Sequence, residues 1–462
     1  MKYQYRFLAR IIIEAKSPLN IGSGNKGIKT DSLVLRDING LPFIPGTTIA
    51  GLLRHSLGKD EAYLMGSQDM GSPLIITEAK MLNCDGLVLD GILTQEQLSS
   101  HFLADFRQLP IRQHAKIGHR GSTIKGGKFD EEIVFKGTRF CFEMEMLSEE
   151  SDDTALKKLL NTLNSDTFRI GSGSRSGFGE IEVVDSQCLY KKIDLTDEEQ
   201  KAWYLKKSSS LSEPWHDAEV LKLQKPPMSP TSEWIPYEIE LKPTDLLLFG
   251  SGLGNEKADM TFVRETFVKW SGERAEIVDS ERVLLIPASS VKGALSHRVA
   301  FHYNRLTQKY VDTLSEGESI ENYVGKNNVA VKALFGSEGD KGPDGKLQNK
   351  QRGNVLMSDI IEEAQLSPKV LNHVSIDRFT GGAIDGALFN EEALYAKGHQ
   401  FILKLWVNQA AFNGNENVRE AFHCALKDLC SGMLPLGGGV NRGNGCFEGT
   451  IKRNGELIYE NH

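Results

Sequence analysis

The chain carries one ordered set of short motifs twice, and this duplication constrains its fold more than any other feature. An Asp-x-x-x-x-Arg pattern at Asp31–Arg36 returns at Asp259–Arg264. An Ile-Pro segment with small residues and hydroxyls follows each time, first at Ile44–Arg54 and then at Ile286–Leu295. Each half ends on a run of glycines. A repeat this long is typical of a duplicated domain rather than a solenoid, so we expect two domains with one site each.

The domain boundaries and the fold class follow from composition and the order of elements. We predict a first domain at residues 1–186, a linker at 187–232 and a second domain at 233–462. The linker has a serine run and several prolines, which favour turns, and one polar helix expected at 194–207. Within each half, strands surround a helix at the Ile-Pro segment and a second helix, expected at 153–163 and 417–430. This order predicts an α+β fold of two tandem ferredoxin-like or RRM-like domains.

Composition excludes several classes of protein. No apolar run is long enough to span a bilayer, and we expect neither a signal peptide nor a membrane partner. The six cysteines form no CxxC pair, which favours reduced thiols in a cytoplasmic protein. A net charge of −8 argues against a uniformly basic surface but allows a local basic groove, because attraction depends on the local field.

The two Ile-Pro segments are candidate phosphate-binding sites. Hydroxyl residues at a helix start can cap it, free amides there attract anions, and a glycine one turn later permits close approach. The residues in question are Thr47, Thr48 and Gly51, with Arg54 nearby, and Ser289, Ser290 and Gly293, with Lys292 nearby. A simple capped helix is the alternative, and the repetition favours phosphate binding.

The glycine runs carry one arginine each, Arg175 and Arg442. Glycine lets backbone amides face an anion, and arginine can bind phosphate through two nitrogens. Each run precedes a strand rather than opening a helix, so it is not a dinucleotide-binding fingerprint. A tight structural turn remains the alternative.

A third repeated segment joins basic residues and glycines, at 111–128 and 372–383. The first copy holds His119, Arg120 and Lys125, and the second holds Arg378. A basic excursion from an RRM-like sheet suits single-stranded RNA, whereas a solvated hairpin is the alternative, especially for the second copy.

The aspartates of the repeated pattern, Asp31 and Asp259, need a separate explanation. A carboxylate in an RNA groove repels phosphate unless it recruits a divalent cation or handles a proton during attack by a ribose 2′-hydroxyl. The alternative is an aspartate that caps a turn. No histidine or lysine partner is visible beside either aspartate in the sequence.

Taken in order, these motifs resemble the RAMP-superfamily backbone subunits of type III CRISPR effector complexes. The fused pair is most similar to the double backbone subunit of the type III-D variety. The resemblance implies a modified RRM fold with an inserted thumb hairpin in each domain, near 114–128 and 373–388, reaching over guide RNA. It implies as partners a CRISPR guide RNA, a target single-stranded RNA and other effector-complex subunits. Ala50 stands where the family often has lysine, whereas the second domain keeps Lys292.

The resemblance also implies site residues. In the family, an aspartate before the Pro-Gly helix is needed for metal-dependent cleavage of target RNA. It falls on Asp31 and Asp259, which would be catalytic and would hold Mg²⁺ or Mn²⁺. The RNA-binding residues expected are Gly46, Thr47, Thr48, Gly51, Arg54, His119, Arg120, Lys125 and Arg175, and then Ser289, Ser290, Lys292, Gly293, Arg378 and Arg442.

We therefore expect a cytoplasmic, guide-RNA-bound subunit that cleaves complementary RNA at one aspartate site per domain. Three alternatives remain at this point. The chain could be a non-catalytic scaffold or cap on guide RNA, a guide-processing endoribonuclease that uses a histidine such as His119, or an unrelated enzyme with a phosphate ligand.

Overall fold

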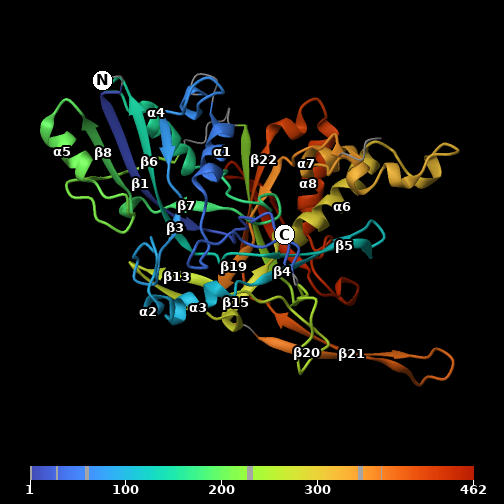
Figure 1. The fold of residues 1–462 in the computed structure, drawn as a ribbon. Coiled ribbons are helices and arrows are strands. Elements are labelled where there is room, and N and C mark those ends of the chain that lie inside the picture. Colours follow the sequence, from blue (N-terminus) through green and yellow to red (C-terminus); the bar gives the residue numbers. More distant parts are fainter. Residues whose placement is uncertain are drawn as a thin grey trace.

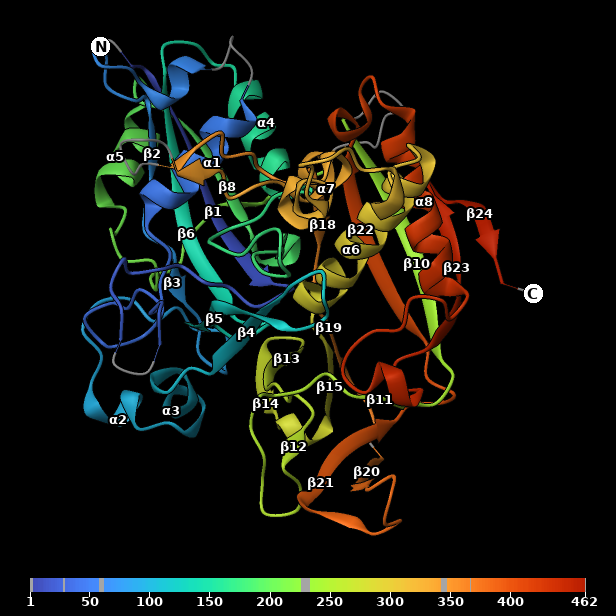
Figure 2. The same cartoon turned by 90° about the vertical axis from the view of Figure 1, so that its right-hand side faces the viewer.

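The chain folds into two α+β bodies that lie side by side (Figure 2). The structure is a computed structural model and describes residues 3–27, 30–57, 62–225, 233–341, 347–365 and 367–461. No helix in these ranges is both long and apolar enough to cross a membrane. The six cysteines are all free.

The first domain is built around strand β1, which pairs antiparallel with β6 on one side and with β7 and β8 on the other. Residues Phe7 and Ile11 of β1 face the helices, because side chains alternate along a strand, whereas Leu8 and Arg10 face outward. The elements are β1 (Tyr5–Ala15), α1 (Gly46–Ser56), β2 (Leu74–Ile76), β3 (Lys80–Met81), α2 (Gln95–Leu98), α3 (His101–Arg107), β4 (Ile111–Ile117), β5 (Thr123–Glu132), β6 (Arg139–Ser148), α4 (Thr154–Leu163), β7 (Ile181–Val183), β8 (Leu189–Asp194), α5 (Glu198–Lys206) and β9 (Glu219–Val220).

The second domain repeats this plan. Its central strand β10 lies between β22 and β23, and β18 and β24 complete the sheet. The main elements are β10 (Trp234–Pro243), β15 (Val283–Ile286), α6 (Ala288–Leu306), α7 (Val329–Phe335), β18 (Val355–Met357), β19 (Ile360–Glu363), β20 (Pro368–Ile376), β21 (Ala383–Tyr395), β22 (Phe401–Asn408), α8 (Glu416–Cys430), β23 (Phe447–Arg453) and β24 (Glu456–Glu460). Shorter strands are β11 (Leu246–Leu247), β12 (Met260–Thr261), β13 (Phe267–Ser271), β14 (Arg274–Val278), β16 (Asp340–Lys341) and β17 (Leu347–Gln348). The predicted α+β fold with two tandem ferredoxin-like domains is confirmed.

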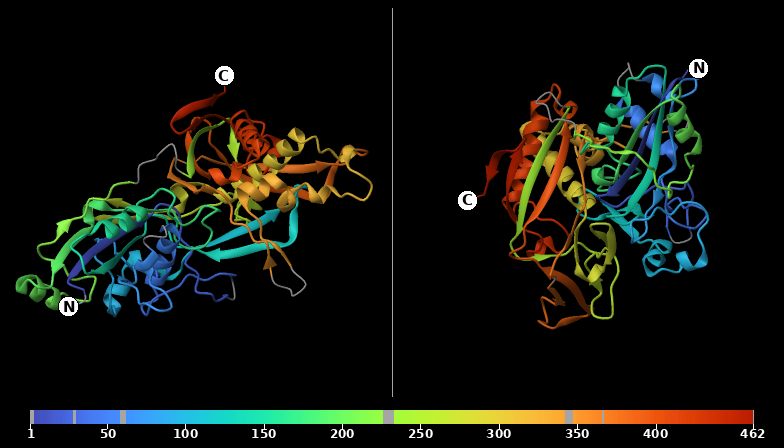
Figure 3. Two further views of the ribbon diagram at one scale, coloured as in Figure 1. Left: turned by 90° about the horizontal axis from the view of Figure 1, so that it is seen from above. Right: turned by 90° about the vertical axis from the view of Figure 1, so that its left-hand side faces the viewer.

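Each domain also extends one long hairpin. The first hairpin is β4–β5 and the second hairpin is β20–β21, and both lie in the segments where hairpins were expected. The first hairpin crosses to the second domain and runs beside α6, whereas the second hairpin projects away from both bodies (Figures 1 and 3). At its tip Phe379 is 94% exposed.

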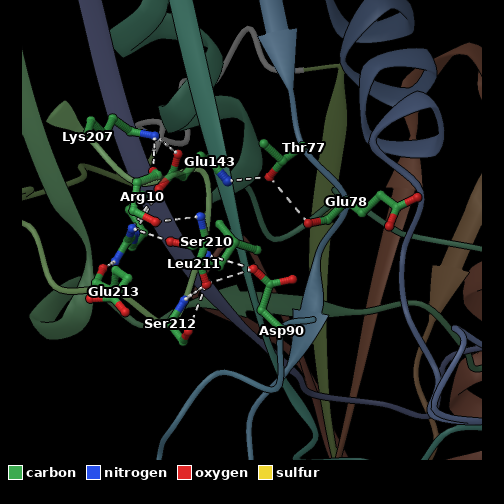
Figure 4. A network of polar contacts seen from close by, with 11 residues as sticks. Arg10, Thr77, Glu78, Asp90, Glu143, Lys207, Ser210, Leu211, Ser212 and Glu213 are labelled. Carbon is green, nitrogen blue, oxygen red and sulfur yellow. Dashed lines mark hydrogen bonds and ion pairs between the residues drawn. The ribbon is translucent and has the colours of Figure 1, made fainter. Parts of the chain in front are cut away.

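The outer face of the first sheet is covered, and this differs from the predicted linker. Strands β8 and β9 extend the sheet, so much of residues 187–232 belongs to the first domain. Figure 4 shows the buried ion pair of Arg10 and Glu143 on this face, with Lys207 2.7 Å from Glu143. Arg10 also donates hydrogen bonds to the backbone carbonyls of Ser210 and Glu213. Because this segment covers the sheet, bases cannot stack there as they do on an open RRM sheet.

The second domain closes the remaining part of that face with its β13–β14 hairpin. The indole of Trp270 donates a hydrogen bond to the carbonyl of Gly137 at 2.7 Å, and the Arg139 guanidinium lies 4.0 Å from the ring centroid. The Val268 amide donates to the Lys136 carbonyl at 2.8 Å. The two domains are therefore joined by packing and backbone hydrogen bonds as well as by the chain.

Candidate functional site

Asp31 and Asp259 occupy equivalent places at the base of the two hairpins. The Asp31 amide donates to the carbonyl of Asp130 at 3.0 Å, and the Asp130 amide donates to the Asp31 carboxylate at 3.4 Å. In the second domain, the Asp259 amide donates to the Asn390 side chain at 2.7 Å, and the Asn390 amide donates to the Asp259 carboxylate at 2.9 Å. Both aspartates are exposed. Each carboxylate is thus fixed by hairpin backbone while it still faces solvent.

The arginine of the repeated pattern holds this loop in place. Arg36 pairs with Glu132 at 2.6 Å, and Arg264 pairs with Glu392 at 3.5 Å. Glu132 also accepts the amide of Val34 at 2.8 Å. These arginines are therefore structural in both domains. In each pattern the aspartate contacts the hairpin at Asp130 or Asn390, and the arginine contacts it two residues later, at Glu132 or Glu392.

A stacked histidine–phenylalanine pair lies at the base of each hairpin, and the sequence reasoning missed it. His114 stacks on Phe129 with ring centroids 4.7 Å apart, and His373 stacks on Phe389 at 4.9 Å. Each histidine Nε2 approaches a glutamate, Glu131 at 2.9 Å in the first domain and Glu391 at 3.2 Å in the second. The signal was available as a Phe-Asp/Asn-Glu-Glu motif at 129–132 and 389–392.

The helix starts differ from the prediction. Pro45 and Pro287 are the N-cap residues, and no side chain caps either helix at that position, so Thr47, Thr48, Ser289 and Ser290 lie within the first turn. In the second domain the carboxylate of Asp359 accepts the Ala288 amide at 2.7 Å. That helix start is therefore partly occupied by a carboxylate of the same chain.

The glycines of these helices have two different roles. A Cβ on Gly46 would collide with the carbonyl of Ile76, so this glycine is required by packing inside the chain. A Cβ on Gly51 or Gly293 would meet nothing within 4 Å. Internal packing does not require these two glycines, and they leave the helix surface open to a ligand.

Several predicted RNA-binding cations are engaged within the protein. His119 and Arg120 lie 3.5 Å and 3.8 Å from Glu321 of the second domain. Arg442 pairs with Glu391 at 2.5 Å, and Arg54 donates to the carbonyl of Gly66 at 3.2 Å. The remaining predicted cations are Lys125 and Arg378, which are exposed, and Arg175 and Lys292, which are half-buried. Because His119 helps to dock the first hairpin, a guide-processing role for this residue gains no support.

A buried ionic cluster locks the first hairpin onto the second domain. Arg112 of β4 contacts Glu265 and lies 2.9 Å from Asp359, and all three side chains are nearly inaccessible. Burial raises the pKa of the Glu265 carboxyl, and the charge of Arg112 opposes this shift. The same Asp359 carboxylate binds the start of α6, so hairpin and helix share one anchor.

The donor set at the aspartates fits a hard divalent cation better than a soft one. The described ranges hold no cluster of three or more histidine, cysteine or acidic side chains arranged for a metal. In the first domain the neighbouring Asp130 has a buried carboxylate oxygen without a hydrogen-bond partner. Mg²⁺ binds in this way, through one or two carboxylates plus substrate phosphates and water.

The comparisons with known proteins agree with the duplicated geometry. The chain matches the RAMP superfamily model over residues 12–182 and 260–448, one range in each domain. It is 30% identical over 201 residues to the CRISPR system Cms endoribonuclease Csm3 of Methanocaldococcus jannaschii, an alignment that covers 39% of this chain and 79% of that protein. The chain therefore belongs to the RAMP superfamily, whose domain it contains twice in tandem.

Proposed function

We propose that this chain is a backbone subunit of a type III CRISPR ribonucleoprotein, where it binds guide RNA and cleaves the paired target RNA. The observation that carries the proposal is the equivalent placement of Asp31 and Asp259 at the bases of the two hairpins. The similarity to a relative named an endoribonuclease supports RNA cleavage. The partners would be guide RNA, target RNA and other effector subunits, in the cytoplasm.

The chemistry that suits these carboxylates is transesterification within the RNA. The 2′-oxygen of one ribose attacks the adjacent phosphorus, the bond from phosphorus to the 5′-oxygen breaks, and a 2′,3′-cyclic phosphate and a 5′-hydroxyl result. The aspartate accepts the proton of the 2′-hydroxyl or holds the cation, and a proton is delivered to the departing 5′-oxygen. Mg²⁺ or Mn²⁺ held by Asp31 with Asp130, or by Asp259, would stabilise the charge that develops on the phosphate oxygens.

Guide RNA would follow the open helix surfaces rather than the sheet faces. In α1 this surface carries Thr47, Gly51 and Arg54, which share one side of the helix because they are three or four residues apart. Residues Ser289 and Gly293, which are also four residues apart, form the counterpart in α6. The exposed Lys125 and Arg378 would add charge from the hairpins.

The test is cleavage of target RNA by the reconstituted complex with Mg²⁺ or Mn²⁺. The variants are Asp31→Asn, Asp259→Asn and the double variant, because asparagine keeps an acceptor for the hairpin amide and removes the charge. We expect each single variant to lose one product and to retain guide binding. Asp37→Asn is the control, since the Asp37 carboxylate accepts hydrogen bonds within its own turn, from the Asn39 amide and side chain and from the Leu41 amide. An unchanged product pattern in the double variant would leave the chain as a non-catalytic scaffold.

A further inference from the structure

Three cations from both halves of the chain converge where the first glycine run meets the start of α6. Gly177 bridges to Ser358, and a Cβ on Gly177 would collide with Asp359 and crowd the Ala288 side chain. This contact brings Arg175, two residues earlier, to the second domain, where its Nε donates to the Gly353 carbonyl at 2.7 Å.

The two other cations lie next to these contacts. Lys292 is one turn into α6, four residues after Ala288. Arg352 directly precedes Gly353, the residue whose carbonyl Arg175 contacts.

These cations are not neutralised by the protein. Over the residues that the structure describes, no carboxylate forms an ion pair with Arg175, Lys292 or Arg352. Two acids of the second domain pair with other cations: Asp359 contacts Arg112, and Glu338 lies 3.0 Å from Lys116. Arg175 and Lys292 are half-buried and Arg352 is exposed. Like charges that are partly buried without a counter-ion are unfavourable, and a bound anion would offset this cost.

The pKa directions agree with this charge balance. Burial, followed by the charges of Arg352 and Arg169, lowers the pKa of Arg175. Burial, followed by the charge of Arg175, lowers the pKa of Lys292, and the charge of Glu338 opposes this shift less strongly. The two cations therefore act on each other, although one belongs to the first domain and the other to the second.

We propose that Arg175, Lys292 and Arg352 together bind one backbone phosphate of RNA at the point where the strand passes from the first domain to the second. The proposal rests on the RNA-binding function above and adds a site shared by both domains. The planar guanidinium suits two phosphate oxygens, and the lysine adds a point charge. Gly293, next to Lys292, leaves space for the strand to approach.

Among the described residues, the matching motifs of the other domain do not form a second site of this kind. The counterpart of Lys292 in α1 is Ala50, which carries no charge. The second glycine run carries its arginine, Arg442, one position later than the first, and Arg442 pairs with Glu391 of its own domain. The two motifs that the sequence presents as separate binding elements thus combine at the domain junction into a single site.

A double-mutant cycle on the full chain tests the proposal. Binding of a fluorescent single-stranded RNA is measured over a salt series for wild type, Arg175→Gln, Lys292→Gln and the double variant. Lys206→Gln is the matched control, because Lys206 is an exposed cation on α5, which lies on the far side of the first domain from α6 (Figure 1). Thermal unfolding without RNA checks that each variant folds.

The expected result is a loss of affinity on the order of tenfold for each single variant. The double variant should lose little more, and the slope of log affinity against log salt should fall once, by about 0.7, because one phosphate contact is removed. If the loss of affinity in the double variant equals the product of the two single losses, and the salt slope falls by twice this amount, the two residues bind separate phosphates. The proposal of a shared site would then be wrong. If wild type binds RNA and the variants bind it as tightly as Lys206→Gln does, this inference fails alone. If wild type does not bind RNA, the proposed function fails with it.

Discussion

Arg112 belongs to the first hairpin, but both carboxylates that it contacts, Glu265 and Asp359, belong to the second domain. Removing one partner of a buried ion pair leaves an uncompensated charge, which costs far more than the loss of an exposed pair. At the scale of single residues, this cluster therefore determines how firmly the hairpin is held.

We predict that Arg112→Met lowers the free energy of unfolding by about 3–5 kcal/mol at neutral pH. Without Arg112, the folded-state pKa of Glu265 rises further above its ordinary value of 4.5. The folded state then binds more protons than the unfolded state, so the deficit should shrink as pH falls through the raised pKa toward 4.5. Chemical denaturation at several pH values measures this.

Arg120→Met is the control for that experiment. Arg120 also bridges the hairpin to the second domain, but its side chain is 79% exposed, so little stability should be lost. Equal losses of unfolding free energy in the two variants would contradict the role of Arg112 in the buried cluster. So would a loss in Arg112→Met that does not change with pH.

Individual residues also show how far the sequence could predict the site. The equivalence of Asp31 and Asp259 could be predicted because they stand in a local pattern that occurs twice. Their partners Asp130 and Asn390 lie 99 and 131 residues further on, and pairing at those separations leaves no local signature. The capping role assigned to Thr47 was wrong, because Pro45 supplies the extended backbone that precedes the helix and takes the N-cap position itself.

At the scale of elements, helix α1 contains two glycines with different surroundings. Gly46 lies against the carbonyl of Ile76 and cannot accept a side chain, whereas Gly51 faces open space. A glycine inside a helix is less stable than alanine unless packing or a ligand requires it. The element thus separates a glycine needed for folding from one that the fold does not need.

We predict opposite effects for alanine at these two positions. Gly51→Ala should raise the free energy of unfolding by roughly 0.5–1 kcal/mol and weaken guide-RNA binding. Gly46→Ala should lower stability, because the helix must move away from β2. Thermal unfolding and RNA titration of the same samples check both. If Gly51→Ala binds RNA as tightly as wild type, the open face of α1 is not the path of the strand.

The elements themselves were largely predictable, because the apolar alternation of β1 and the helix following each Ile-Pro segment are local features. The structure of the segment at 187–232 could not be predicted in this way. Its polar, proline-containing composition resembles a linker, yet β8 gains its place by pairing with β1, which lies far away in sequence. Burial of Leu8 and Trp215 in one cluster follows from that pairing.

At the scale of the whole molecule, Trp270 of the second domain packs against the first-domain cluster of Ile12, Leu82 and Cys141. Burial raises the pKa of the Cys141 thiol to about 12, so this cysteine is protonated and unreactive. The reactivity of Cys141 therefore reports whether the two domains stay in contact.

We predict that Trp270→Ala makes Cys141 react with an alkylating reagent under mildly alkaline conditions, because solvent reaches the thiol and its pKa falls. Cys430 is the internal control, since it is buried in the second domain and its pKa is also raised to about 12. Mass spectrometry of the alkylated chain measures both sites. Slow and equal modification of the two cysteines would show that the junction does not depend on Trp270.

The docking of the first hairpin in the second domain of the same chain has a consequence for stoichiometry. Subunits that meet by association separate on dilution, whereas partners on one polypeptide keep a high effective concentration. The Arg112 cluster and the Trp270 contact are therefore always present in a ratio of one to one with the domains they join. The spacing between the Asp31 and Asp259 loops along any bound strand is consequently fixed by covalent linkage and does not vary with the amount of protein.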